Sequence, residues 1–153
     1  MFDTKRFMQE KFEPRTADVP MPELADFFDK GETPVFKVRG LEGFEVGRAK
    51  EAAARNRNIK AILEGIVSQR SEDVKNAVRK LIGADDDVPQ EIAEKIEFVL
   101  AGLVEPPDWK LDNVLWLCRN FPVNFYALSQ KILELTGLGH IPGKPRPSGS
   151  PAK

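Results

Sequence analysis

The chain of 153 residues offers few of the side chains that common catalytic and metal sites require. It contains one histidine, His140, and one cysteine, Cys118. A zinc cage built from histidine and cysteine, an internal disulfide and a redox pair of thiols are therefore excluded within one chain. A nucleophile activated by histidine would have to use His140, which lies in a Gly- and Pro-rich stretch without a rigid support.

The remaining candidate groups are each explained by ordinary structural roles. Cys118 falls on the apolar stripe of a predicted helix, where cysteine behaves as a small hydrophobic residue rather than as a reactive thiol. The successive carboxylates Asp85–Asp87 are oxygen ligands of the kind that hard cations take, but the calcium-loop spacing is absent and a solvated turn is favoured. The sequence therefore predicts no enzymatic activity, no cofactor and no metal site.

The charge balance argues against a general attraction to nucleic acid or to a membrane surface. Lys and Arg number 23 and Asp and Glu number 24, a formal net charge of −1. Basic residues do gather in one stretch, but nearby glutamates dilute it, and a solvated helix junction is the favoured interpretation. A small helical DNA-binding or regulatory protein of a prophage is kept as the alternative function, and it would use Arg48, Arg55, Arg57 and Lys60.

The cellular compartment is predicted from the absence of export signals. No apolar run reaches the roughly 18 residues that a membrane-spanning helix needs. The first residues, MFDTKRFMQEKFEPR, lack the apolar core of a signal peptide. We therefore expect a cytoplasmic protein with a reduced Cys118 and no membrane partner.

Helices are the elements that must position these groups, because apolar residues recur at helical spacing along most of the chain. Ile92, Ile96 and Val99 illustrate the pattern, and Pro89 and Pro122 suit the first turn of a helix. The expected helical segments are a turn near 4–12, a short helix over 22–31, and helices over 44–56, 59–67, 74–82, 89–105, 111–118 and 122–137.

Val35, Phe36 and Val38, between Pro34 and Gly40, predict the one convincing strand. A lone strand has to pair with a weak second segment or with another copy of the chain. The predicted fold class is mostly α, a compact bundle of about six helices with one short N-terminal strand and a disordered C-terminal tail. The expected parts are an N-terminal arm with a short helix over 1–33, a helical domain over 34–137 and a flexible Pro/Gly-rich tail over 138–153.

Aromatic side chains concentrate near the end of the predicted domain, within residues 109–126. Trp116 and Tyr126 lie beside the apolar stripes of their helices rather than on them, whereas Phe125 fits the stripe of its helix. Large aromatic residues away from the core face are typical of interfaces. An equal alternative to an interface role is that these aromatic side chains pack beneath the connection over residues 106–109.

Three segments carry a resemblance to a known family: 36–41 with Gly43 and Arg48-Ala49, the run 52–58, and the closing pair of segments 115–125 and 131–137. Over roughly residues 34–137 this arrangement resembles the tail assembly chaperones of long-tailed bacteriophages and prophages. The resemblance implies a non-enzymatic helical protein in the cytoplasm of the bacterial host that is absent from the mature virion. It also implies binding to the tape-measure protein, which the chaperone keeps soluble, and help in recruiting tail-tube subunits.

We expect partner contacts at the strand and at the aromatic cluster, and no nucleic-acid partner. A homo-oligomer is left open, formed by pairing the strand between protomers or by docking the phenylalanine-bearing residues 2–12 on a neighbour. The predicted partner-binding residues are Val35, Phe36, Val38, Trp109, Trp116, Phe121, Phe125 and Tyr126.

Overall fold

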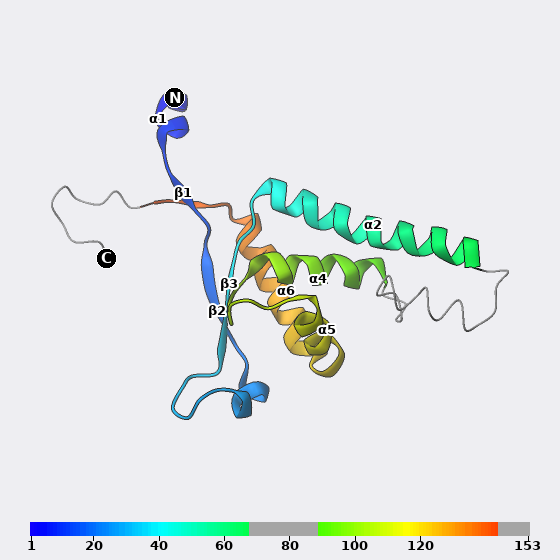
Figure 1. Ribbon diagram of the computed structural model, residues 1–153. Helices are drawn as coiled ribbons and strands as arrows, with labels where there is room; N and C mark the ends of the chain where they lie inside the picture. The colour runs from blue at the N-terminus through cyan, green and yellow to red at the C-terminus, as the bar shows by residue number, and fades with distance from the viewer. Residues whose placement is uncertain (68–88, 144–153) are drawn as a thin grey trace.

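The computed structural model describes the backbone over residues 1–67 and 89–143, and the side chains over residues 1–55 and 89–143. Helices and short strands are interspersed along these ranges (Figure 1). In chain order the elements are α1 (Thr4–Gln9), β1 (Phe12–Glu13), β2 (Thr16–Pro20), the 3₁₀ helix η1 (Pro22–Phe27), β3 (Val35–Arg39), α2 (Gly43–Val67), α4 (Gln90–Gly102), β4 (Leu103–Glu105), α5 (Leu111–Asn120), α6 (Pro122–Gly137) and β5 (Ile141–Pro142).

The predicted strand forms as β3, but the expected helical bundle with a single strand is wrong. In the described part of the chain, β3 is the centre of a three-stranded antiparallel sheet in the order β2-β3-β4. It pairs with β2 from Thr16↔Arg39 to Pro20↔Val35, and with β4 at Lys37↔Glu105 and Val38↔Leu103. Both sides of β3 therefore have partners within the chain, so this strand does not need another protomer.

The C-terminal tail was expected to be disordered from residue 138, and this is also wrong over residues 138–143. β5 pairs with β1 at Phe12↔Pro142 and Glu13↔Ile141, and the Gly143 N–H donates to the Lys11 carbonyl at 2.6 Å. The Arg15 Nε–H donates to the Gly139 carbonyl at 3.0 Å. Composition misled here because backbone hydrogen bonds to a distant segment order these residues without burying a large apolar side chain.

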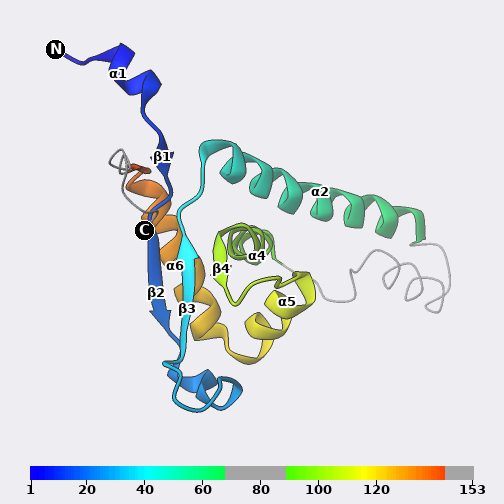
Figure 2. The ribbon, with the colours of Figure 1, turned by 60° about the vertical axis from the view of Figure 1, so that its left-hand side comes forward.

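The segment before β3 was expected to be an arm, yet most of it contributes to the same core as residues 34–137. Val19 of β2, Met21 and Leu24 are buried and belong to one hydrophobic cluster with Phe36 and Leu128. Within residues 1–34, α1 and β1 extend away from this body, before the start of β2 (Figure 2). The expected domain boundary at residues 33/34 therefore runs between two paired strands of one sheet.

The later helices agree with the apolar stripes that predicted them. Ile96 and Val99 of α4, Val114 of α5, and Leu128 and Ile132 of α6 are all buried. α4 ends at Gly102 rather than at Pro106 because the chain turns there into β4. The buried faces of these helices form the main core of the molecule.

The earlier helical predictions fare less well. One continuous helix, α2, runs from Gly43 to Val67 where two helices were expected on either side of Asn58. Asparagine inside a helix costs only about 0.7 kcal/mol relative to alanine, so it does not force a break. The expected helix over 74–82 and the turn at Asp85–Asp87 lie outside the described residues.

The elements stack in layers behind the sheet. α6 packs against β2 and β3, α4 and α5 pack against α6, and α2 lies along the outer side of α4 (Figures 1 and 2). The closing segment of α6 also fixes the turn after β3, because the Leu41 N–H donates to Thr136 Oγ1 at 2.9 Å. This hydroxyl in turn donates to the Ile132 carbonyl at 2.6 Å.

α4 and α6 approach each other closely at Gly102. A Cβ atom at Gly102 would lie 2.7 Å from Ile132 Cδ1, and the Ile132 side chain is fully buried. Gly102→Ala should therefore lower the free energy of unfolding by about 1 to 3 kcal/mol, because the added methyl group overpacks the core. Urea denaturation measures this change.

A matched control for the Gly102 substitution lies in α2. Gly47 is exposed, and a Cβ atom there would meet no atom within 4 Å. Gly47→Ala should raise the free energy of unfolding by about 0.5 to 1 kcal/mol, because alanine loses less backbone entropy on folding. Equal effects at the two glycines would contradict the close packing of α4 on α6.

An ion pair fixes the junction between β3 and α2. Arg39 Nη1 donates to Glu45 Oε1 at 2.9 Å and Arg39 Nη2 donates to Glu45 Oε2 at 2.6 Å. The Glu42 N–H also donates to Glu45 Oε1 at 3.0 Å. Hydrogen bonding from Arg39 is the main cause that lowers the pKa of Glu45 from 4.5 to about 2.

This pair predicts a loss of stability in acid. The carboxylate of Glu45 has a lower pKa in the folded chain, so its contribution is fully present above pH 4.5 and is lost as the pH falls towards 2. Glu45→Gln should cost about 1 kcal/mol at neutral pH, and this cost should shrink over that acidic range. Denaturation of both proteins across pH 2 to 6 measures it, with Glu51→Gln on the same helix as the control for removing a charge. A cost that stays constant with pH would contradict the pair's role.

Candidate functional site: an aromatic groove

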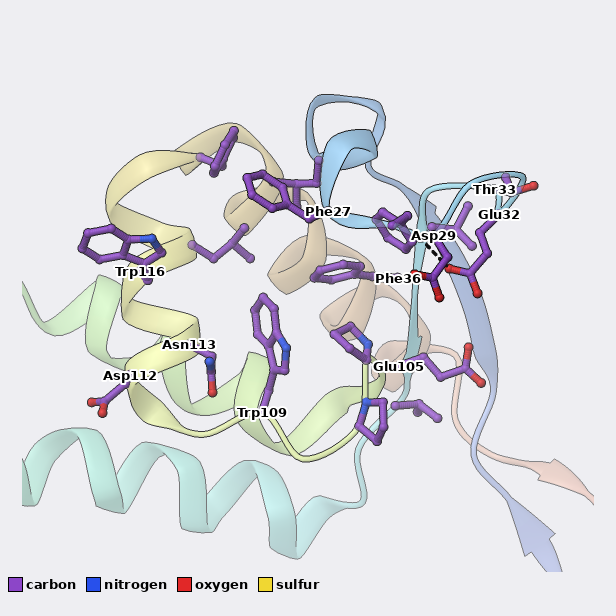
Figure 3. Close-up of a pocket in the computed structure, with 18 residues that line it drawn as sticks. Phe27, Asp29, Glu32, Thr33, Phe36, Glu105, Trp109, Asp112, Asn113 and Trp116 are labelled. Atoms are coloured by element: carbon purple, nitrogen blue, oxygen red, sulfur yellow. Dashed lines mark hydrogen bonds between the residues drawn. The ribbon is translucent and has the colours of Figure 1, made fainter.

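A groove of about 1250 Å³ opens on the side of the molecule where η1, the start of β3 and α5 meet (Figure 3). Pro22 begins η1, and the β4–α5 connection passes through Pro106 and Pro107 before it reaches Trp109. Sheet pairing brings these elements together, since β4 joins β3 directly before this connection. The groove is therefore built from segments that are far apart in the sequence.

The floor of the groove is apolar and firmly packed. Phe36 is only 4% exposed, and its ring meets that of Trp109 edge to face, with centroids 5.2 Å apart and planes at 85°. The Phe28 ring lies 6.2 Å from that of Phe36. Leu24 and Leu117 are buried beside them. Such interlocked rings give a surface that holds its shape when a partner binds.

The walls of the groove expose large apolar side chains to solvent. Phe27 of η1 is 79% exposed and Trp116 of α5 is 65% exposed, and both line the groove (Figure 3). Phe121, at the end of α5, lines it as well. Exposed apolar side chains that gather around a concavity are typical of a site that binds another molecule.

The rim of the groove carries carboxylates. Asp29, Glu32, Glu105 and Asp112 line it, and among the residues whose side chains are described no lysine, arginine or histidine does so. The Asp29 N–H donates to Glu32 Oε2 at 3.2 Å, which fixes the loop between η1 and β3. Gly31 allows the tight turn of this loop through its φ of +88°.

The structure brings together five of the eight residues that the sequence predicted to bind a partner. They line the groove: Val35, Phe36, Trp109, Trp116 and Phe121.

The other three predicted contact residues do not line the groove. Val38 and Phe125 were wrongly placed at a contact surface, because both side chains are fully buried in the core. Tyr126 is 41% exposed but faces Lys95, whose Nζ lies 5.7 Å from the ring centroid. Its ring also meets that of Phe125 at 5.7 Å.

Sequence reasoning missed the η1 side of the groove and its acidic rim. Leu24, Phe27 and Phe28 fall in the short helix expected over 22–31, and no role was predicted for the four carboxylates. The available signal was the adjacent pair Phe27-Phe28, since a short helix cannot bury two large neighbouring side chains on one face.

The other groups considered from the sequence form no metal-binding cluster within the described residues. In the parts of the chain that the structure describes, no group of three or more His, Cys, Asp or Glu residues is arranged to hold a metal ion. His140 is half-buried at the start of β5, and Arg48 and Arg55 are exposed on α2. The side chains of Arg57 and Lys60 lie outside the described residues. None of the helices in the described ranges is both long and apolar enough to span a bilayer.

Cys118 is half-buried against the core, and burial raises the pKa of its thiol. Because the thiolate is the reactive form, the folded protein should react with a disulfide reagent at neutral pH at least about tenfold more slowly than the same chain in urea. Absorbance of the released thiol measures both rates. Equal rates in the folded and unfolded chains would contradict the burial of Cys118.

Comparisons with protein-family models, with curated proteins and with solved structures found no significant match to this chain.

Proposed function

We propose that this protein is a non-enzymatic tail assembly chaperone of a bacteriophage or prophage. It would bind the tape-measure protein in the cytoplasm of the bacterial host, keep it soluble and help to recruit tail-tube subunits. It would be absent from the mature virion. Two lines of support combine here: the sequence resemblance over residues 34–137, and the groove that the structure adds to it.

The observation that carries the proposal is the groove with its packed aromatic floor and exposed aromatic walls. Trp109 and Phe36 form a packed apolar surface, while Phe27 and Trp116 line the same groove with side chains exposed to solvent. Recognition of an amphipathic helix places its apolar side chains into such a groove. A groove of about 1250 Å³ suits several side chains of a polypeptide better than one small molecule.

This arrangement explains how a small protein can keep a long apolar helix in solution. Each bound copy removes one apolar stretch of the tape-measure protein from water and replaces it with the charged outer surface of the chaperone. Release needs no chemical step, because the bound stretch is held only by apolar and polar contacts. Tail-tube subunits can then replace the chaperone along the same helix.

Co-expression tests the proposal. The tape-measure protein of the same phage or prophage should be largely insoluble when expressed alone and largely soluble when this chain is present. The two proteins should then co-purify. A tape-measure protein that stays insoluble with and without this chain would overturn the proposal.

The DNA-binding alternative makes a different prediction. Phosphate contacts would give retention on DNA that weakens steeply as salt is raised. Glu45 and Glu51 lie on the same helix as the exposed Arg48 and Arg55, so the described part of α2 carries mixed charge. We expect no salt-sensitive retention on DNA.

A further inference from the structure

The groove combines an apolar floor with carboxylates at its rim. Asp29 and Glu32 lie in the loop between η1 and β3, and Asp112 lies in the first turn of α5 on the far side of Trp109 (Figure 3). The carboxylates therefore flank the aromatic floor from two different elements. A bound segment would pass between them.

The local balance of charge at the groove is one-sided. Within residues 1–55 and 89–143, the side chains that line the groove include four carboxylates and no basic group. Lys30 and Lys110, which follow Asp29 and Trp109 in the sequence, do not line the groove. Glu105 lies opposite Lys37 in the strand ladder, so the argument rests on Asp29, Glu32 and Asp112.

We propose that the groove selects polypeptide segments in which large apolar side chains are flanked by lysine or arginine. This inference rests on the proposed function, because it specifies which stretches of the tape-measure protein the groove would take. The apolar side chains fill the floor beside Trp109 and Phe36, and the flanking cations lie against the carboxylates of the rim. An acidic segment with the same apolar stripe meets like charges on both sides and binds more weakly.

The selection comes from partly solvated charges, so it is sensitive to salt. Exposed charge pairs each contribute modestly, and an ionic strength near 1 M shortens the screening length to about 3 Å. Three carboxylates acting together should favour a cationic over an acidic segment by about tenfold or more at low salt. The contribution of the apolar floor should remain at high salt.

Two synthetic helical peptides with the same Leu/Phe stripe test the inference, one with lysines and one with glutamates flanking the stripe. Fluorescence anisotropy of each labelled peptide is measured against the full chain at low and high salt. We expect the lysine peptide to bind at least about tenfold more tightly at low salt, and this ratio to fall to about twofold near 1 M salt. Equal affinities at low salt, or no binding of either peptide, would overturn the inference.

Two matched triple variants distinguish an effect of the rim carboxylates from an effect of the protein's net charge. The triple variant Asp29→Asn, Glu32→Gln and Asp112→Asn keeps the Glu32 side-chain acceptor for the Asp29 N–H. It should weaken lysine-peptide binding about tenfold. The control triple variant Asp18→Asn, Glu51→Gln and Glu134→Gln removes the same number of charges outside the groove and should change binding less than twofold.

These experiments distinguish a failure of charge selection from a failure of the proposed function. If co-expression solubilises the tape-measure protein but the two peptides bind equally, the chaperone proposal stands and charge selection is wrong. If the rim and control variants weaken lysine-peptide binding equally, the effect comes from net charge and the rim has no special role. If co-expression fails while the peptides bind selectively, the groove takes cationic apolar segments of another protein.

Discussion

Phe125→Ala should lower the free energy of unfolding by about 3 to 5 kcal/mol. Phe125 is fully buried between α6 and the rest of the core, in one cluster with Val114 and Leu128. Removing the ring loses its transfer from water and leaves a cavity that the surrounding helices and sheet cannot fill. This loss approaches the whole stability of a small domain, so part of the variant should be unfolded even without denaturant.

Urea denaturation followed by circular dichroism measures the effect, with two matched variants. Phe125→Leu keeps most of the apolar volume and should cost about 1 to 1.5 kcal/mol. Val123→Ala, two residues earlier on the same helix, removes a side chain that is 79% exposed and should cost less than about 0.5 kcal/mol. Similar losses for Phe125→Ala and Val123→Ala would contradict the placement of Phe125 in the core.

Trp116→Ala should weaken binding of a tape-measure segment by about 30-fold or more, since a large aromatic side chain in a contact surface often contributes 2 kcal/mol or more. The Trp116 side chain is 65% exposed and lines the groove, so it offers apolar area that only a partner can cover. For the same reason the free energy of unfolding should change by less than about 0.5 kcal/mol. Titration calorimetry with a soluble helical fragment measures the binding.

Tyr126→Ala is the matched control for Trp116. Tyr126 is also a partly exposed aromatic residue, but it lies outside the groove beside Lys95. We expect its removal to change binding less than about threefold. Equal losses at Trp116 and Tyr126 would show that the binding surface is not the groove.

The helices near the C-terminus could be predicted because each carries its own apolar stripe. Ile96 lies on the stripe of α4, Val114 on that of α5 and Ile132 on that of α6, and the structure buries all three. β2 and β4 could not be predicted in the same way. Strands of five and three residues show too few alternations to stand out, and their partners are chosen by packing rather than by local sequence.

The sequence predicted one side of the groove and missed the other. The density of aromatic residues within 109–126 pointed to the α5 side of the groove. The η1 side and the rim carboxylates Asp29 and Glu32 come from residues 24–33, and they reach the groove because β2, β3 and β4 form one sheet. Phe125 was assigned to the contact surface by residue type although its position on the apolar stripe indicated burial. The stripe was the better guide, because it reports which side of the helix faces the core.

The contact between the groove and a tape-measure segment is the central claim, and photo-cross-linking tests it most directly. Phe27 lines the groove and Val123 lies outside it, yet the side chains of both are 79% exposed. A benzoylphenylalanine placed at either position is equally accessible to solvent in the free protein. We predict that the residue at position 27 cross-links to the co-expressed tape-measure protein and that the residue at position 123 does not. Equal cross-linking from the two positions, or cross-linking from position 123 alone, would contradict the account.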